Sequence, residues 1–190
     1  MMISKRITVS TLTALALTVP APTLVHAQAG AIVTLVVPAG QFGSDQFTDL
    51  LVNSLGAAKG FCGALDKPYQ VDCLAERINR LADSIPGDSD YAEVRELLEQ
   101  TSRDMASLAR SNRDASAPRQ RASTGSQATT RPLTPIREAS LATVNEQATA
   151  ILERTETLLL RTPDDDSGKK LHYTRIAEAI GYNKTLLRST

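Results

Sequence analysis

The chain has 190 residues, the length of a single domain, and its 21 basic and 21 acidic residues give a formal net charge of zero. This balance excludes a strong overall attraction to nucleic acid or to an anionic membrane. With four Tyr, three Phe and no Trp, the core must be built mainly from aliphatic side chains. Such a composition favours helices over a β-sandwich.

The first residues are typical of a secretory signal peptide. Lys5 and Arg6 form a positive head, an uncharged and mostly apolar stretch follows over 7–19, and Ala27 closes a small-residue cleavage motif. The apolar stretch is too short for a membrane-spanning helix, which needs about 20 residues. We therefore expect residues 1–27 to be removed, no transmembrane segment to remain, and the mature protein to lie in the periplasm or outside the cell.

Residues 28–43 are expected to form an extended or poorly ordered start of the mature chain. Their β-branched run at 31–37 would suit a strand, but the sequence offers no second strand to pair with it. A strand that adds to a partner's sheet is the alternative.

Cys62 and Cys73 are the only cysteines of the chain. In an oxidising compartment, an isolated pair most simply forms one structural disulfide. The alternatives are a redox pair, whose cysteines typically lie two residues apart, and a metal site, which needs further Cys or His ligands. We expect the disulfide, and we expect no bound metal and no cofactor.

Three helices are predicted over 44–111, because apolar residues recur there at intervals of three and four. The first is a short N-terminal helix, followed by a loop over 61–70, and the next two form an αα-hairpin. The predicted starts are Ser44 or Asp45, Asp72 and Asp90, and the predicted ends are Gly60, Ile85 and Ser111.

The segment 112–133 has almost no apolar bulk and is predicted to be a flexible linker. Thr134, which precedes a proline, predicts the N-cap of a fourth helix that ends at Thr162. A fifth helix is predicted from near Lys169, giving a second αα-hairpin over 134–190. The predicted fold class is thus all-α: a small helical bundle of two αα-hairpins with a short N-terminal helix and a flexible central linker.

Two threonines interrupt the apolar registers of the third and fourth predicted helices. Thr101 and Thr155 each occupy a core position at a comparable depth in their helices. We expect them to face each other or a partner chain. If they are buried, changing both to Leu should raise the thermal stability.

Catalytic residue types are scarce in the mature chain. His172 is its only histidine, and with lysines and an arginine near it in sequence it is expected to be a solvated surface imidazole. The acidic run 164–166 lacks the glycine and carboxylate spacing of a calcium-binding EF-hand loop. It is expected to favour a helix N-terminus instead.

The segment 174–187 has the spacing of a helix-turn-helix, with Ala177 at the helix crossing and Gly181 in the turn. A DNA-binding protein using this segment is therefore one alternative function. The other interpretation of Gly181 is the C-cap of an ordinary bundle helix.

The predicted linker carries four arginines and one aspartate, a net charge of +3 over 112–133. It would either touch an anionic surface, such as lipid headgroups or cell-wall polymer, or act as a solubilising spacer. Aromatic side chains that would stack on bases are missing from it, so no nucleic-acid partner is expected.

These observations favour an exported, non-enzymatic helical-bundle protein that acts as an envelope-associated binding, scaffolding or chaperone-like module. Its partner would be a protein or another cell-envelope component, and the heptad-like seams would allow oligomerisation. Besides DNA binding, a hydrolase with an unrecognised carboxylate site is an alternative, since carboxylate pairs need only meet in space. No catalytic residue is identified.

Overall fold

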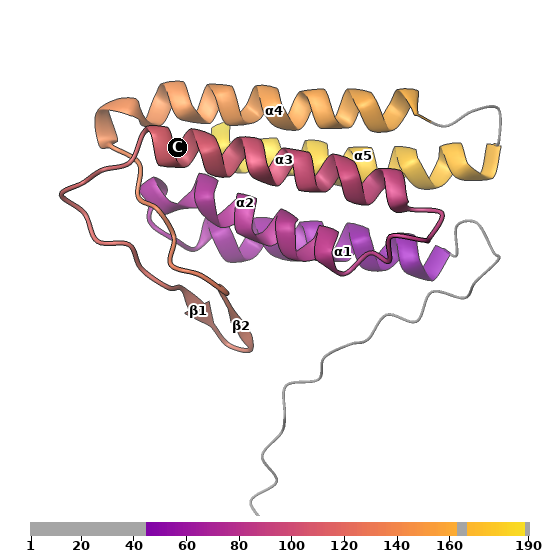
Figure 1. Ribbon diagram of the computed structural model, residues 1–190, viewed down its shortest axis with the longest axis horizontal. Helices are drawn as coiled ribbons and strands as arrows, with labels where there is room; N and C mark the ends of the chain where they lie inside the picture. Colours follow the sequence, from indigo (N-terminus) through magenta and orange to yellow (C-terminus); the bar gives the residue numbers. More distant parts are fainter. Residues whose placement is uncertain (1–44, 163–166, 189–190) are drawn as a thin grey trace, which may run out of the picture. The chain divides into compact units, whose positions relative to one another are not determined.

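The computed structural model describes residues 45–162 and 167–188 of the chain (Figure 1). The predicted signal peptide 1–27, the segment 28–43 and the acidic run 164–166 lie outside the described residues. Among the described helices, none combines the length and apolar character required to cross a membrane.

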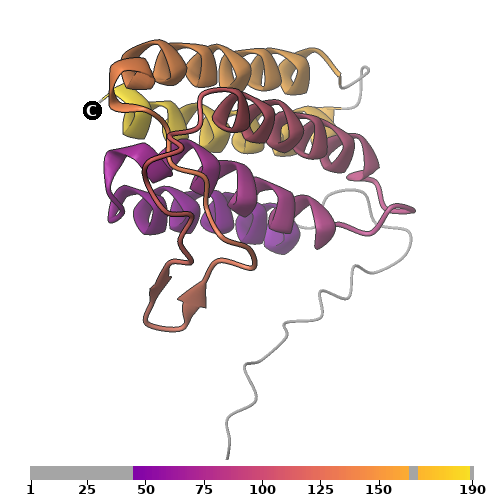
Figure 2. The same cartoon turned by 60° about the vertical axis from the view of Figure 1, so that its left-hand side comes forward.

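Five α-helices make up most of the described chain, and each packs against the next in sequence. The last helix also packs against the first, so that the helices close into a ring (Figures 1 and 2). The predicted all-α helical bundle is therefore confirmed. The helices are α1 (Asp45–Gly63), α2 (Lys67–Asp83), α3 (Ala92–Ser111), α4 (Leu141–Arg161) and α5 (Ser167–Arg188).

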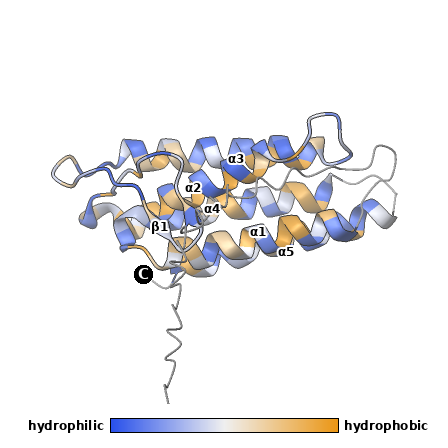
Figure 3. Cartoon of the chain, turned by 90° about the horizontal axis from the view of Figure 1, so that it is seen from below, coloured by the Kyte–Doolittle hydropathy of each residue, from blue (hydrophilic) through white to orange (hydrophobic). Residues whose placement is uncertain are grey.

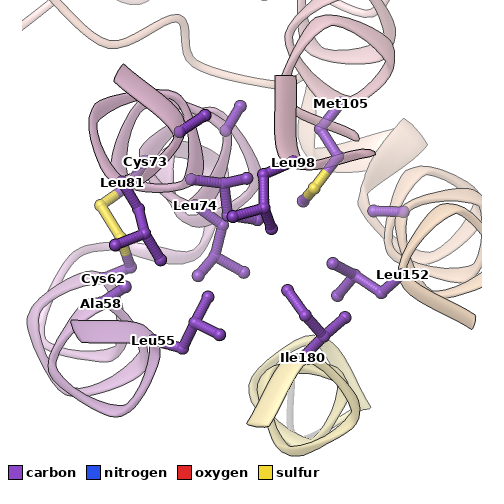
Figure 4. Packing of buried hydrophobic residues seen from close by; sticks show 14 of the residues in the cluster. Leu55, Ala58, Cys62, Cys73, Leu74, Leu81, Leu98, Met105, Leu152 and Ile180 are labelled. Atoms are coloured by element: carbon purple, nitrogen blue, oxygen red, sulfur yellow. A yellow bond between two sulfur atoms is a disulfide. The ribbon is translucent and has the colours of Figure 1, made fainter. Parts of the chain in front are cut away.

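One continuous core fills the centre of this ring. Each helix contributes at least one aliphatic side chain that is 1% exposed or less, and these side chains point toward one another (Figure 4). Along each helix, apolar residues alternate with hydrophilic ones (Figure 3), as expected of helices that bury one face. The central side chains are Leu55, Leu74, Leu98, Leu152 and Ile180.

The end of α1 and the start of α2 differ from the prediction by several residues. α1 continues through Gly60, because Phe61 and Cys62 are buried on its last turn. α2 begins at Lys67, with a proline in its first turn, so most of the predicted loop 61–70 is helical. As a result, Asp72 is not an N-cap but a fully buried residue inside α2.

The start of the fourth helix also differs from the prediction. α4 begins at Leu141 after a 3₁₀ turn over Glu138–Ser140, and not at Thr134. Thr134 is buried, and its backbone N–H donates to the carboxylate of Asp72. The residue is therefore held by α2 and does not cap α4.

The predicted linker forms part of an arm, defined here as residues 113–136, that folds back on itself (Figure 2). Its tip is an antiparallel hairpin of β1 (Ser123–Thr124) and β2 (Gln127–Ala128), and Gly125 supplies the positive φ of 57° that a two-residue turn requires. The arm connects the two helical hairpins as expected. It differs from the expected flexible linker in being hydrogen-bonded to α2.

Candidate functional site

A disulfide joins Cys62, near the end of α1, to Cys73 in α2, with a Cα–Cα distance of 5.7 Å. Both cysteines are fully buried. The two residues singled out from the sequence are thus brought together, and the covalent bond fixes the spacing of α1 and α2. No group of His, Cys, Asp and Glu suited to a metal ion occurs among the described residues.

A cavity of about 250 Å³ lies between α1, α2 and the tip of the arm. We call it the arginine cavity. Lining residues with small side chains leave room for this cavity between the two helices. Apart from Ala and Leu side chains, it is lined by Ser54, Arg77, Arg80, Ser84 and Gln127.

Arg77 is the least solvated charged group of the arginine cavity. Its side chain is only 10% exposed, and its Cζ lies 3.8 Å from the ring centroid of Phe61. The nearest carboxylate oxygen among the described residues is Oε2 of Glu76. It lies 3.6 Å from Nε of Arg77, which is within ion-pair range but beyond hydrogen-bond distance. Within the described structure, Nε and Nη2 of Arg77 are buried without a hydrogen-bond partner.

The electrostatics of Arg77 follow from this position. Burial lowers the pKa of its guanidinium from the ordinary value, Glu76 raises it, and the second cavity arginine, Arg80, lowers it again. Two like charges therefore share the cavity, and no acidic side chain of the described residues lines it. The arrangement suits a bound anion. Sequence reasoning missed it, because nothing in the spacing of the two arginines places α1 and the arm beside them.

The expectation that His172 is a solvated surface imidazole is wrong. Its side chain faces the interior and is 7% exposed, and its Nδ1 lies 2.8 Å from Oγ1 of Thr48 in α1. The same Oγ1 lies 2.8 Å from the hydroxyl of Tyr91. Since α5 already begins at Ser167, His172 lies one turn into the helix, where its side chain packs toward α1.

A hydroxyl beside an imidazole is the pairing of a nucleophile and its base. However, Thr48 is fully buried and Tyr91 is 1% exposed, so a substrate has no path to the hydroxyl in this structure. The cluster of Thr48, Tyr91 and His172 therefore ties α1 and α5 to the start of α3. Its geometry is that of a structural hydrogen-bond network.

Three carboxylates, those of Glu93, Glu96 and Glu99 of α3, line another cavity of about 450 Å³ near the end of α4. Glu146 and Glu153 of α4 line a further cavity, of about 530 Å³. A hydrogen bond from Lys169 lowers the pKa of Glu93, and a hydrogen bond from Arg95 lowers the pKa of Glu99. A general acid working near neutral pH needs a raised pKa. Glu93 and Glu99 are thus held in the charged form, which disfavours the hydrolase alternative at the cavity that they line.

The alternative of a helix-turn-helix at 174–187 does not fit the structure. The segment lies within the single helix α5, which continues through Gly181 to Arg188, so Gly181 is neither a turn residue nor a C-cap. Ala177 is fully buried in the core of the bundle. Gly181 lies against α4 instead, where an added Cβ would come within 3.0 Å of Oε1 of Glu156.

Two of the linker arginines bind the protein's own backbone and side chains. Arg131 forms a bidentate ion pair with Asp72, at 2.6 and 2.8 Å, and Arg121 donates to the backbone oxygen of Thr130 at 2.6 Å. Arg131 thus attaches the arm to α2, whereas Arg121 joins two segments of the arm itself.

Comparison with protein-family models, with curated proteins and with solved structures finds no match for the chain.

Proposed function

We propose that the protein is exported and works as a binding or scaffolding module of the cell envelope. The observation that carries this proposal is the buried disulfide between Cys62 and Cys73. Structural disulfides persist in oxidising compartments and are rare in the cytosol. The signal-like residues 1–27 supply the route to such a compartment.

Binding, and not catalysis, is the mode of action that the geometry favours. The Thr48–His172 pair has the composition of a catalytic pair but is sealed inside the bundle. The carboxylates of Glu93 and Glu99 are engaged by cations of the protein itself. What remains open to a partner is the surface, including a cavity with two arginines.

Cell fractionation combined with thiol alkylation tests the export proposal. The full-length chain is expressed in a bacterial host with a C-terminal tag, and both its location and the mass of its N-terminal peptide are determined. We expect a mature chain that begins at Gln28 in the exported fraction. Its two cysteines should resist alkylation until a reductant is added.

A variant that lacks residues 1–27 provides the matched control, because it should stay in the cytosol with alkylatable cysteines. An intact, uncleaved wild-type chain inside the cell with both thiols free would contradict the proposal. Turnover of cell-wall, peptide or phosphate-ester substrates by the purified mature protein would contradict the binding mode.

A further inference from the structure

We infer that the arginine cavity is a binding site for a phosphate group, with Arg77 and Arg80 as its charged contacts. This inference rests on the geometry of the cavity and stands whether or not the chain is exported. It assigns a ligand class, which the proposed binding role leaves open.

Arg77 carries a buried charge whose hydrogen-bond donors are only partly used. A guanidinium with one-tenth of its surface exposed normally has its donors satisfied, since a buried charge without full pairing is costly. Here Nε and Nη2 have no hydrogen-bond partner in the described structure, and the closest carboxylate oxygen is 3.6 Å away. Since these two nitrogens are covered by protein atoms, an anion held in the cavity would not bond to them but would place a second negative charge beside a guanidinium that is paired only at 3.6 Å, with Glu76.

Hydrogen-bond donors from three segments of the chain surround the cavity. Arg80 on the next turn of α2 adds a second guanidinium, whose planar fork matches the oxygens of a phosphate. Ser54 of α1 and Gln127 of the arm bring a hydroxyl and an amide from two other elements. Convergence of donors from three separate segments is typical of a binding site.

Covalent and hydrogen bonds hold the elements around the cavity in place. Small side chains such as Ala57 leave the gap between α1 and α2, and the disulfide of Cys62 and Cys73 holds the two helices at a fixed spacing. Arg80 also donates to the backbone oxygen of Ala128, which keeps the arm at the edge of the cavity. At about 250 Å³, the cavity is smaller than typical pockets for drug-sized ligands, so it suits a single charged group.

Titration of the full chain with sodium phosphate, against sodium chloride and sodium acetate at equal ionic strength, tests the site. Binding is followed by calorimetry and by amide chemical shifts. We expect saturable phosphate binding that is weakened about tenfold or more in both Arg77→Met and Arg80→Met, since each removes a hydrogen bond to a charged ligand. Arg119→Met, which removes the same charge from an exposed position outside the cavity, should bind like the wild type.

Ala57→Leu gives an independent test that keeps both arginines. Ala57 is an exposed lining residue, so the larger side chain should fill the cavity without disturbing the core. We expect it to abolish phosphate binding while the melting temperature stays near that of the wild type. Phosphate binding that survives Ala57→Leu, an equal loss in Arg119→Met, or acetate binding as tight as phosphate would each overturn the inference.

Two further titrations distinguish the possible sources of the phosphate group. The first titration uses soluble glycerol phosphate, and the second measures co-sedimentation with phosphatidylglycerol vesicles. Vesicle binding that Ala57→Leu abolishes would assign the site to a lipid headgroup. Binding of glycerol phosphate without vesicle binding would assign it to a soluble phosphate ester. If neither glycerol phosphate nor vesicles nor inorganic phosphate binds, the inference fails.

Discussion

Thr101 and Thr155 show how single polar residues are accommodated in this core. Their Oγ1 atoms lie 2.6 Å apart, and each also lies within hydrogen-bond distance of the backbone oxygen four residues earlier in its own helix. With one proton on each hydroxyl, two of these three hydrogen bonds can form at a time. The sequence left open whether the two face each other or a partner chain, and the structure shows that they face each other. Both are buried, at 2% and 5% exposure.

A double-mutant cycle to Val tests this pair. Each single change, Thr101→Val or Thr155→Val, should cost about 1 kcal/mol, because it removes one side of a buried hydrogen bond. The double change should cost less than the sum of the two, since replacing both partners with apolar groups of the same shape is nearly neutral. Chemical denaturation measures the three free energies. Strict additivity would show that the contact contributes nothing.

The ionisation of Glu93 makes the free energy of unfolding depend on pH in the acid range. Lys169 and Tyr173 each donate to its Oε2 at 3.0 Å, and the hydrogen bond from Lys169 is the larger cause that lowers its pKa below the ordinary value of 4.5. A carboxyl with a lowered folded-state pKa stabilises the fold above its unfolded pKa, and this contribution is lost as the pH falls through the folded value.

We therefore expect the melting temperature of the wild type to fall more steeply below pH 4.5 than that of Glu93→Gln, whose side chain does not titrate. Thermal unfolding at a series of pH values measures the difference. Glu96→Gln removes an exposed carboxylate of the same helix and should keep the wild-type dependence. Parallel curves for the wild type and Glu93→Gln would contradict this assignment.

The arm is positioned by one face of α2, on which a polar contact to the arm occurs at every fourth residue. The backbone oxygen of Pro68 accepts from Ile136, Asp72 accepts from Arg131 and Thr134, and Glu76 accepts from Thr130. Arg80 donates to Ala128 one turn later. The arm thus runs antiparallel to α2 as a strip of hydrogen bonds.

Arg131→Met should weaken the attachment of the arm to α2. Asp72 is fully buried, but the side chain of Arg131 is 40% exposed, so removing the guanidinium should cost about 1–3 kcal/mol, less than breaking a fully buried pair. We expect a loss of stability of this order and faster proteolysis within the arm. Denaturant unfolding and limited proteolysis measure the two effects.

Arg119→Met is the control, since it removes an equal charge from an exposed position of the arm. In the double variant Asp72→Asn with Arg131→Met, much of the stability should return, because no unpaired charge remains buried. An unchanged stability of Arg131→Met alone would show that the ion pair does not hold the arm.

The helices were predictable from sequence because apolar side chains recur at helical spacing, as in Leu74 and Ile78 of α2. The contacts of the arm were not, since they are made by polar groups whose partners lie more than 50 residues away, as for Arg131 and Asp72. The disulfide was predictable because the chain offers only one pairing. The arginine cavity was not, because it depends on how α1, α2 and the arm meet.

At the scale of the whole described unit, the closed ring of helices makes each half depend on the other. Leu55 of α1 lies opposite Ile180 of α5 in the shared core, and Thr48 of α1 bonds to His172 of α5. The two predicted αα-hairpins therefore have no separate cores. Removing apolar contact from α1 should weaken α4 and α5 as much as it weakens α2.

Leu55→Ala tests this cooperativity. The truncation of a fully buried Leu should cost about 2–5 kcal/mol, and because the cavity opens in a core that all five helices share, the loss should appear throughout. Hydrogen exchange at increasing denaturant, read on peptides of α2 and of α4, measures the opening free energy of each half. We expect equal decreases in the two helices. A decrease in opening free energy confined to α1 and α2, with α4 unchanged, would show that the second hairpin is stable on its own. The contact between α1 and α5 would then close the ring without stabilising it.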